Sequence, residues 1–413
     1  MTVEDALREA WDEADVADRV GLHGRGLFGM PQLSEEADRR LAELVQAVHR
    51  APTSDDLFDA CLGRYSRRLG EGGNYFTSAH LARLMVSLAS PQPGERILDL
   101  ACGSGGLLVE SARQVSSKTG GEDELVLMGR DINNEARQIA AMNLAAHGLR
   151  GDLGQGPADS LRRPGGPPSA CDVVLVNPPF NVSNWVGRVP EAGSRWRFGE
   201  PPRDNANFAW LQRAEEELSR TGRAVVLLAD SAATGARPVE QAIRKGLVDS
   251  DVLAALVALP KEIFLHARTS ACLWILSADR KHPGWGRHPR SKQVLFIDAS
   301  PTEKPAIRGY RALPEESIRR ITTTFSTWRG DDAGPGHPDA YEDVAGWCRS
   351  VSRADMEAGG YDLRPSRHVA GSDTGVVEPG GVDRTYELTR ELYSLFDDAH
   401  HLEQRLRTLL DEA

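Results

Sequence analysis

The stretch DVVLVNPPFN, residues 172–181, decides the fold class of this 413-residue chain. Its first half is apolar and β-branched, which is typical of a strand buried on both faces of a parallel sheet. Pro178 and Pro179 cannot donate to a sheet ladder, so the strand has to end at Asn177. The sequence therefore predicts that Asn177 and Phe180 lie at the carboxyl edge of a strand, which is where ligands bind in open α/β sheets.

Further apolar segments of strand length alternate with helical stretches in the central part of the chain. They are RILDL (96–100), LVLMGRD (125–131), RAVVLLA (223–229), VLAALVALP (252–260), ACLWILS (271–277) and QVLFIDAS (293–300). Alternation at this spacing predicts an α/β fold with a doubly wound, mainly parallel sheet.

The remaining segments predict three smaller parts. Residues 1–70 have apolar positions at helical spacing and are expected to form a helical N-terminal domain. Residues 301–384 are rich in Pro, Gly and charge, which predicts a loop-rich extension whose fold the sequence leaves undefined. In residues 385–413, apolar residues recur in alternating steps of four and three, the spacing of a heptad seam. This last helix either docks a partner or packs on its own domain.

Composition indicates an ordinary globular protein. Hydrophobic residues make up 40% of the chain and charged residues 26%, and no apolar run approaches the length of a membrane span. The acidic, helical start shows no export signal, so a cytoplasmic location is expected. Scattered cysteines without a C-x-x-C pair, and histidines without H-E-x-x-H spacing, predict reduced thiols and no metal site.

The net charge of −11 restricts how the chain could hold nucleic acid, since affinity for a phosphate backbone comes largely from Lys and Arg. One local exception is NWVGRVPEAGSRWRFGEPPRD (184–204), which interleaves arginines with Trp185, Trp196 and Phe198. Such a mixture can bind phosphates and stack bases. A structured loop pinned by its tryptophans explains the composition equally well, so both interpretations stay open.

A second group of residues predicts a nucleoside site. In ILDLACGSGG (97–106) a strand is followed by a glycine-rich turn, where Gly103 and Gly105 would let a ligand approach the backbone. The turn lacks the P-loop lysine and the full G-x-G-x-x-G, which disfavours a nucleotide triphosphate or a dinucleotide. The next strand ends on Asp131, whose carboxylate can accept both ribose hydroxyls. These elements favour another adenosine-containing ligand.

Other positions are ambiguous when taken alone. Asp159, in PADSL, is placed where a side chain could meet an adenine edge, although a turn cap is the simpler interpretation. Tyr75, Phe76 and Thr77 precede a helix, and the two aromatics either line a pocket or pack in the core.

In combination, these motifs resemble a known family. The set NYFTSAH, DLACGSGG, GRD, ADSL, NPPF, RWRFGEPPRDNANFAWLQ and ALPKEIF, in this order, is similar to the modification (methyltransferase) subunit of type I restriction-modification systems. The resemblance covers roughly residues 70–300, with a weaker match at GYDLRPSRHV (360–369). It implies a class I S-adenosylmethionine-dependent methyltransferase fold over residues 71–300 and a site-specific N6-adenine DNA methyltransferase that uses S-adenosyl-L-methionine.

The resemblance also assigns roles by position. Asn177, Pro178, Pro179 and Phe180 correspond to the catalytic motif. The cofactor-binding positions are Tyr75, Phe76, Thr77, Asp99, Gly103, Ser104, Gly105, Asp131 and Asp159. Where the family usually has F-T-P this chain has FTS, and Asn207 replaces a common Asp.

The catalytic motif has a chemical rationale. The exocyclic amine of adenine is a poor nucleophile because its lone pair is delocalised into the ring. The side-chain oxygen of Asn177 and the carbonyl of Pro178 can accept its two N–H bonds and stabilise the positive charge that develops on transfer. Phe180 would stack on the base once it is flipped out of the duplex. The methyl group then moves by in-line displacement, which depends on positioning more than on acid–base groups.

The resemblance implies partners as well. The part after residue 300 is thin for recognising a base sequence, so we expect a separate specificity subunit that binds double-stranded DNA and docks this chain through the heptad helix. The usual complex pairs two modification subunits with one such reader, and a restriction subunit would be another chain. Two alternatives remain: a protein or RNA amine methyltransferase that shares N-P-P-F, and a non-catalytic subunit of a phage-defence complex.

Overall fold

The computed structural model describes residues 77–370 apart from 121–124, 163–169, 184, 186–195, 262, 264–269, 302–311 and 332–339. The predicted helical domain 1–70, the heptad helix 385–413, Tyr75 and Phe76 lie outside the described residues. The chain divides into a unit Met1–Val369, which holds nearly all the described residues, and a unit Ala370–Ala413. The domain boundaries drawn from the sequence stay predictions.

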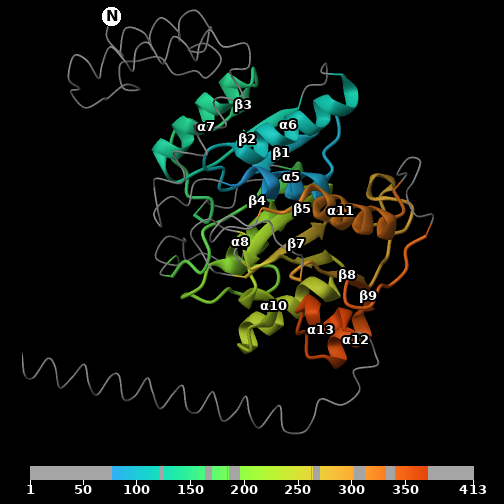
Figure 1. Cartoon of the computed structure of the whole chain (residues 1–413). Coiled ribbons are helices and arrows are strands. Elements are labelled where there is room, and N and C mark those ends of the chain that lie inside the picture. The colour runs from blue at the N-terminus through green and yellow to red at the C-terminus, as the bar shows by residue number, and fades with distance from the viewer. Residues whose placement is uncertain are drawn as a thin grey trace, which may run out of the picture. The chain divides into compact units, whose positions relative to one another are not determined.

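A nine-stranded sheet organises the described part of the chain (Figure 1). Its strands are β1 (Arg96–Asp99), β2 (Val126–Gly129), β3 (Gly151–Asp152), β4 (Cys171–Val176), β5 (Leu218–Ala229), β6 (Leu253–Ala258), β7 (Ala271–Ser277), β8 (Gln293–Asp298) and β9 (Cys348–Ser352). Across the sheet they follow the order β3-β2-β1-β4-β5-β7-β6-β8-β9. Neighbouring strands are parallel except at β5–β7, β6–β7 and β8–β9. The prediction of a mainly parallel α/β sheet is therefore confirmed.

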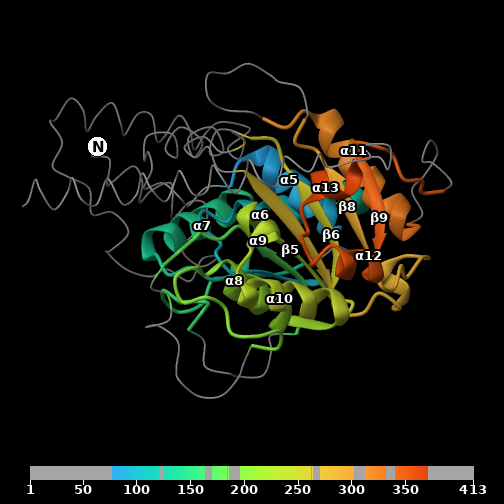
Figure 2. The same cartoon turned by 90° about the horizontal axis from the view of Figure 1, so that it is seen from below.

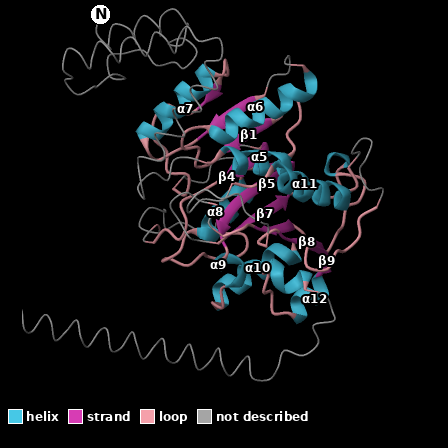
Figure 3. Cartoon of the chain, in the orientation of Figure 1, coloured by secondary structure: helices cyan, strands magenta, loops and turns pink. Residues whose placement is uncertain are grey.

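Helices cover both faces of this sheet (Figures 2 and 3). On one face a hydrophobic cluster includes residues of α5 (Ala79–Ala89), α6 (Gly106–Thr119), α7 (Asn134–Ala146) and α11 (Glu315–Arg329). On the other face a second cluster includes residues of α8 (Asn207–Glu216), α9 (Ser231–Thr234), α10 (Pro238–Asp249), α12 (Arg353–Ala358) and α13 (Pro365–Val369). A short 3₁₀ helix, η4, spans Pro283–Trp285.

The central strand β4 shows why its sequence is a continuous apolar run. Val173 and Leu175 belong to the first cluster, whereas Val174 and Val176 belong to the second. Successive side chains of a strand point to opposite faces, so a strand covered on both sides needs apolar residues throughout. The same strand hydrogen-bonds to β1 on one side and to β5 on the other, which places its carboxyl end in the middle of the sheet edge.

The described parts of the segment 301–384, whose fold the sequence left undefined, contribute to this sheet. Helix α11 packs Ile321, Phe325 and Trp328 into the same cluster as α5. Strand β9 extends the sheet by pairing antiparallel with β8. The indole N–H of Trp328 donates to the Ser350 hydroxyl at 2.9 Å, which joins the helix to the new edge strand.

Three further features bear on the classes of function. In the stretches that the structure describes, none of the helices is both long and apolar enough to cross a membrane. The described cysteines, Cys102, Cys171, Cys272 and Cys348, are free and buried. The same stretches contain no group of three or more His, Cys, Asp or Glu side chains arranged to hold a metal ion.

Candidate active site

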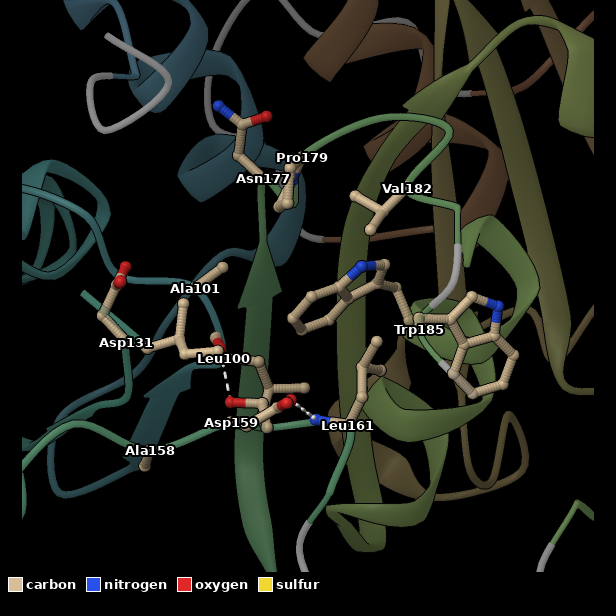
Figure 4. A pocket seen from close by; sticks show the side chains of 13 residues that line it. Leu100, Ala101, Asp131, Ala158, Asp159, Leu161, Asn177, Pro179, Val182 and Trp185 are labelled. Carbon is tan, nitrogen blue, oxygen red and sulfur yellow. Dashed lines mark hydrogen bonds between the residues drawn. The ribbon is translucent and has the colours of Figure 1, made fainter. Parts of the chain in front are cut away.

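A cavity of about 260 Å³ lies at the carboxyl edge of the sheet, beyond the neighbouring strands β1, β2 and β4 (Figure 4). Four of the positions predicted from the sequence line it, namely Asp131, Asp159, Asn177 and Pro179. The other lining residues are Leu100, Ala101, Ile132, Ala158, Ser160, Leu161, Val182, Trp185 and Trp210. The strand ends thus bring together residues from motifs that are far apart in the sequence.

The glycine-rich turn between β1 and α6 requires its glycines for two reasons. Gly103 and Gly105 have φ angles of 51° and 79°, a region that side chains with a Cβ rarely adopt. A Cβ at Gly105 would also come within 3.2 Å of the Ala140 Cβ on α7. Gly105 therefore allows α6 to start close against α7.

Asp131 ties the end of β2 to this turn. Its Oδ2 accepts the backbone N–H of Gly103 at 2.9 Å, and its Oδ1 accepts that of Asn133 at 2.8 Å. An ionised carboxylate has about four lone-pair sites, so both oxygens retain capacity for ligand hydroxyls. The next residue, Ile132, is 55% exposed and lines the cavity. Together they offer a polar and an apolar surface at adjacent positions.

Asp99 and Ser104 support the turn and do not line the cavity. Asp99 is 1% exposed, and its Oδ1 accepts the Ala101 N–H at 3.1 Å. Burial raises the pKa of Asp99 to about 8; the Ala101 hydrogen bond opposes this and the charge of Asp131 adds to it. The Ser104 carbonyl accepts from the Asn143 amide at 2.8 Å, while its buried hydroxyl has no hydrogen-bond partner in the described structure.

Cys102 is buried and is influenced by the charges of Asp99 and Asp131. Burial raises the pKa of its thiol well above the ordinary value, and the charges of Asp99 and Asp131 raise it further. A buried thiol held in its neutral form acts as a packing residue and not as a nucleophile.

Asp159 forms a turn cap and also lines the cavity. Its Oδ1 accepts the Leu161 N–H at 3.1 Å, which is the predicted turn cap. The same side chain lines the cavity. The loop is also joined to β2, because the Ala158 N–H donates to the Asp131 carbonyl at 2.7 Å. The cap therefore does not exclude a ligand contact.

The N-P-P-F motif begins directly after the last residue of β4, as predicted. The Asn177 Nδ2 donates to the Thr77 Oγ1 at 3.0 Å, which leaves the side-chain oxygen as the acceptor of the amide. Pro178 is buried, whereas Pro179 is exposed and lines the cavity. Phe180 is partly buried against the hydrophobic cluster of α5 and α6 and does not belong to the cavity wall.

Asparagines hold the loop that follows this motif. The backbone N–H of Asn181 donates to the Asn207 Oδ1 at 3.1 Å, and the Asn207 Nδ2 returns a bond to the Asn181 Oδ1 at 2.9 Å. The Asn205 Nδ2 donates to the same oxygen at 3.2 Å. Asn181 has a positive φ of 53°, which asparagine tolerates better than most residues. The amide at Asn207 thus supplies a donor that the more common Asp lacks.

The segment 184–204 is fastened to α8 where the structure describes it. The Trp185 indole N–H donates to the Pro202 carbonyl at 2.9 Å, and its ring meets Trp196 edge to face at 5.8 Å. Arg197 forms an ion pair with Glu215 of α8. The backbone N–H of Phe198 donates to the Gln212 Oε1 on the same helix at 2.9 Å. These contacts favour the pinned loop; Arg188 and Arg195 lie outside the described residues.

Sequence reasoning missed several apolar walls of the cavity. Trp210 lies on α8, and its buried indole N–H has no partner among the described residues. Ile132 follows the predicted ribose-binding acid, and Val182 lies two residues after the predicted catalytic motif. An exposed apolar residue directly after a ligand-binding acid is a usable signal, whereas the position of a tryptophan on a buried helix requires the tertiary structure.

Comparison with known proteins adds independent findings. The profile of the N-6 DNA Methylase family matches residues 53–375. The chain is 31% identical over 355 residues to the type I restriction enzyme HindI methylase subunit of Haemophilus influenzae, covering 85% of this chain and 76% of that protein. It is 28% identical over 366 residues to the MjaIX methylase subunit of Methanocaldococcus jannaschii, covering 86% of this chain and 62% of the relative.

Solved structures agree on the fold. The type I restriction-modification methyltransferase subunit from Streptococcus thermophilus superposes with a TM-score of 0.67 at 20% identity, over 89% of this chain and 76% of that one. A modification subunit of a putative type I restriction enzyme from Vibrio vulnificus gives a TM-score of 0.61 at 18% identity, over 88% and 76%. With the strand order, these similarities confirm the predicted class I S-adenosylmethionine-dependent methyltransferase fold.

Proposed function

Since the chain belongs to the N-6 DNA methylase family and is an adenine-specific DNA methyltransferase of type I restriction-modification systems, we propose that S-adenosyl-L-methionine is its methyl donor. We further propose that its substrate is an adenine flipped out of double-stranded DNA, at sites chosen by a separate specificity subunit.

One observation supports this proposal most directly. A single cavity is lined both by Asp131, at the end of β2, and by Asn177, at the end of β4. The first can hold the ribose of a nucleoside cofactor, and the second can accept hydrogen bonds from an amine. Donor and acceptor of the methyl group would then meet across one small space.

The residues present fit S-adenosyl-L-methionine. The glycines at 103 and 105 place no side chain in the turn, and Asp131 can accept the ribose hydroxyls. The indole N–H of Trp210, which lines the cavity and has no partner among the described residues, is a buried polar group that a ligand could satisfy. When bound, the cofactor supplies an electrophilic methyl group on a sulfonium.

This chain's own residues would orient and polarise the target amine. The side-chain oxygen of Asn177 accepts one N–H, and the Pro178 carbonyl accepts the other, which favours a pyramidal nitrogen and stabilises its developing charge. Neither acceptor is a strong base, so they act by hydrogen bonding and leave the proton on the nitrogen until transfer is complete. Phe180 is the proposed stacking partner of the base.

A separate subunit for sequence recognition is proposed for two reasons. The chain has a net charge of −11, which opposes binding to DNA alone. In the described part of 184–204, Arg197 is already paired with Glu215. The heptad helix 385–413 is the proposed contact with the specificity subunit. A second copy of this chain and a restriction subunit would complete the proposed complex, in the cytoplasm.

The proposal is tested by methyl transfer from labelled S-adenosyl-L-methionine to unmethylated host DNA, with this chain alone and with the specificity subunit of the same system. We expect N6-methyladenine, detected by mass spectrometry of nucleosides, only when both are present. Cofactor binding without DNA methylation in either sample would favour a protein or RNA amine as substrate. Absence of cofactor binding would favour a non-catalytic subunit.

A further inference from the structure

A buried arginine on α8 is fastened to the loop that includes Asp159. Arg213 is 3% exposed, and its Nε donates to the Ser160 carbonyl at 3.0 Å. Its two terminal nitrogens pair with Glu216 and Glu217. Trp210, which lines the cavity, lies three residues earlier on the same helix. The helix therefore contributes both a wall of the cavity and an anchor for its loop.

Ser160 is held from the opposite side as well. Its hydroxyl donates to the Leu100 carbonyl at 2.6 Å, a bond drawn beside Leu100 in Figure 4. Leu100 directly follows β1 and lines the cavity. Residues 158–161 belong to neither a helix nor a strand, so hydrogen bonds of this kind decide the position of the loop. Ser160 is thus fixed between the sheet and α8, next to Asp159.

The acid that pairs with Arg213 is itself buried and has further partners. Glu217 is 0% exposed, and the guanidinium of Arg130, next after β2, lies 3.5 Å from its carboxylate. The Glu217 carbonyl accepts the N–H of Cys171, the first residue of β4, at 2.9 Å. Removing a cation from a buried carboxylate is strongly destabilising, because it leaves an uncompensated buried charge. These ion pairs fix the position of the Arg213 guanidinium, so that its Nε donates to the loop at Ser160.

We propose that Arg213 is a positioning residue for the cofactor, which acts through Ser160 to hold Asp159 against the adenosine. The inference rests on the proposed function, because it needs a nucleoside in the cavity. A loop held in its bound position before the ligand arrives loses less conformational freedom on binding. A residue outside the cavity therefore contributes to affinity without touching the ligand.

The first variant is Arg213→Lys, which keeps a cation beside Glu217 and removes the planar Nε donor to Ser160. We expect the Kd of the full chain for S-adenosyl-L-methionine, measured calorimetrically, to rise roughly tenfold, as for loss of one charge-assisted hydrogen bond. We expect kcat at saturating cofactor to stay within about twofold of wild type. The matched control is Glu216→Gln, which alters the other partner of the same arginine and leaves the Ser160 bond intact; its Kd should not change.

A double-mutant cycle with Asp159→Asn separates positioning from simple stability. The Asn side chain can still accept the Leu161 N–H, so the cap is kept while the negative charge is lost. If Arg213 acts through Asp159, its effect on Kd should nearly disappear in the Asp159→Asn background. An equal effect in both backgrounds, or a lowered Tm with unchanged Kd, would overturn the positioning role.

Ser160→Ala keeps the test open if Arg213→Lys does not fold. It removes the hydroxyl bond to Leu100 and leaves the buried ion pair untouched, so it should fold and weaken cofactor binding in the same way. Because Arg213 donates to the backbone carbonyl, which this variant keeps, unchanged affinity here would contradict the step from a fixed residue 160 to Asp159 on which the inference depends. A wild-type chain that does not bind the cofactor would overturn the proposed function together with the inference, whereas binding by all variants with wild-type Kd would overturn the inference alone.

Discussion

The side-chain amide of Asn177 donates a hydrogen bond to the hydroxyl of Thr77, with 3.0 Å between the two atoms, although the residues are 100 positions apart in the chain. Thr77 lies just before α5, whereas Asn177 follows β4. Because the nitrogen end of the amide is engaged, the oxygen end is left to accept hydrogen bonds. The proposed catalytic amide is therefore oriented by a distant segment.

Replacing Thr77 by valine keeps the shape of this side chain and removes the acceptor. We expect kcat to fall roughly fivefold to tenfold, because one neutral hydrogen bond is worth about 1 kcal/mol. The Kd for S-adenosyl-L-methionine should change little. Single-turnover methylation at saturating cofactor and calorimetric titration measure the two quantities separately.

Two further variants control this prediction. Thr77→Ser keeps the hydroxyl and should restore kcat. Ser78→Ala changes the next residue, whose side chain makes no cap hydrogen bond, and should be neutral. If Thr77→Val instead weakens cofactor binding and leaves kcat unchanged, Thr77 serves the cofactor alone, as the family resemblance implies.

Removing the amide itself should have a larger effect. For Asn177→Ala we expect kcat to fall by about 10²–10³, the range found when one preorganised charge-stabilising group is lost. The Kd for S-adenosyl-L-methionine and assembly with the specificity subunit should remain at wild-type values, since Asn177 contacts neither in the proposal. Methylation within tenfold of wild type would exclude Asn177 as the principal acceptor of the target amine.

The sequence predicted the central strands well because their signals are local. The run at β4 is apolar on both faces and ends at two prolines, and both facts are visible without the fold. The start of β5 was less visible: the strand begins at Leu218, five residues before the apolar segment at Arg223. Its first residues, LSRTG (218–222), contain one apolar side chain, and Arg220 and Thr221 are exposed, so they lack the apolar run of a buried strand.

Edge elements and cavity walls were harder to predict. Strand β9, CRSVS, is an edge strand with polar exposed positions, so it has no continuous apolar run. Ile318, Ile321, Phe325 and Trp328 do have helical spacing, but the surrounding Pro, Gly and charged residues dominated the composition of 301–384. Contacts such as Arg213 with Ser160 join segments that only the packed structure brings together.

Gly105 offers a test of the turn that includes a closely matched control. Alanine at Gly105 would adopt an unfavourable φ of 79° and would crowd Ala140 on α7. Gly94 has a φ of 78°, but a Cβ there meets nothing within 4 Å. Gly94→Ala should therefore lower the free energy of unfolding only by the backbone contribution of about 1–2 kcal/mol. Gly105→Ala should lower it by more. Chemical denaturation measures the difference between the two variants.

The same two variants separate an effect on stability from an effect on cofactor binding. Gly105→Ala should weaken the affinity for S-adenosyl-L-methionine because α6 can no longer start in place, whereas Gly94→Ala should not. Equal unfolding free energies for the two variants would show that the contact with α7 is unimportant. Equal cofactor affinities would show that a displaced start of α6 does not affect cofactor binding.

Asp99 predicts how stability depends on pH. Burial raises its pKa from 3.8 to about 8, so the folded chain binds a proton that the unfolded chain releases at much lower pH. The stabilising contribution of that proton is fully present below about pH 4 and is lost progressively as the pH rises towards about 8. Asp99→Asn resembles the protonated form at every pH and can still accept the Ala101 N–H.

The free energy of unfolding of Asp99→Asn, relative to wild type, should therefore increase from about pH 5 to about pH 8. Urea denaturation at several pH values across this range measures it. A difference that stays constant with pH would mean that Asp99 is ionised in the folded chain throughout, despite its burial. Its negative charge would then be available, next to that of Asp131, to attract a cationic ligand to the turn.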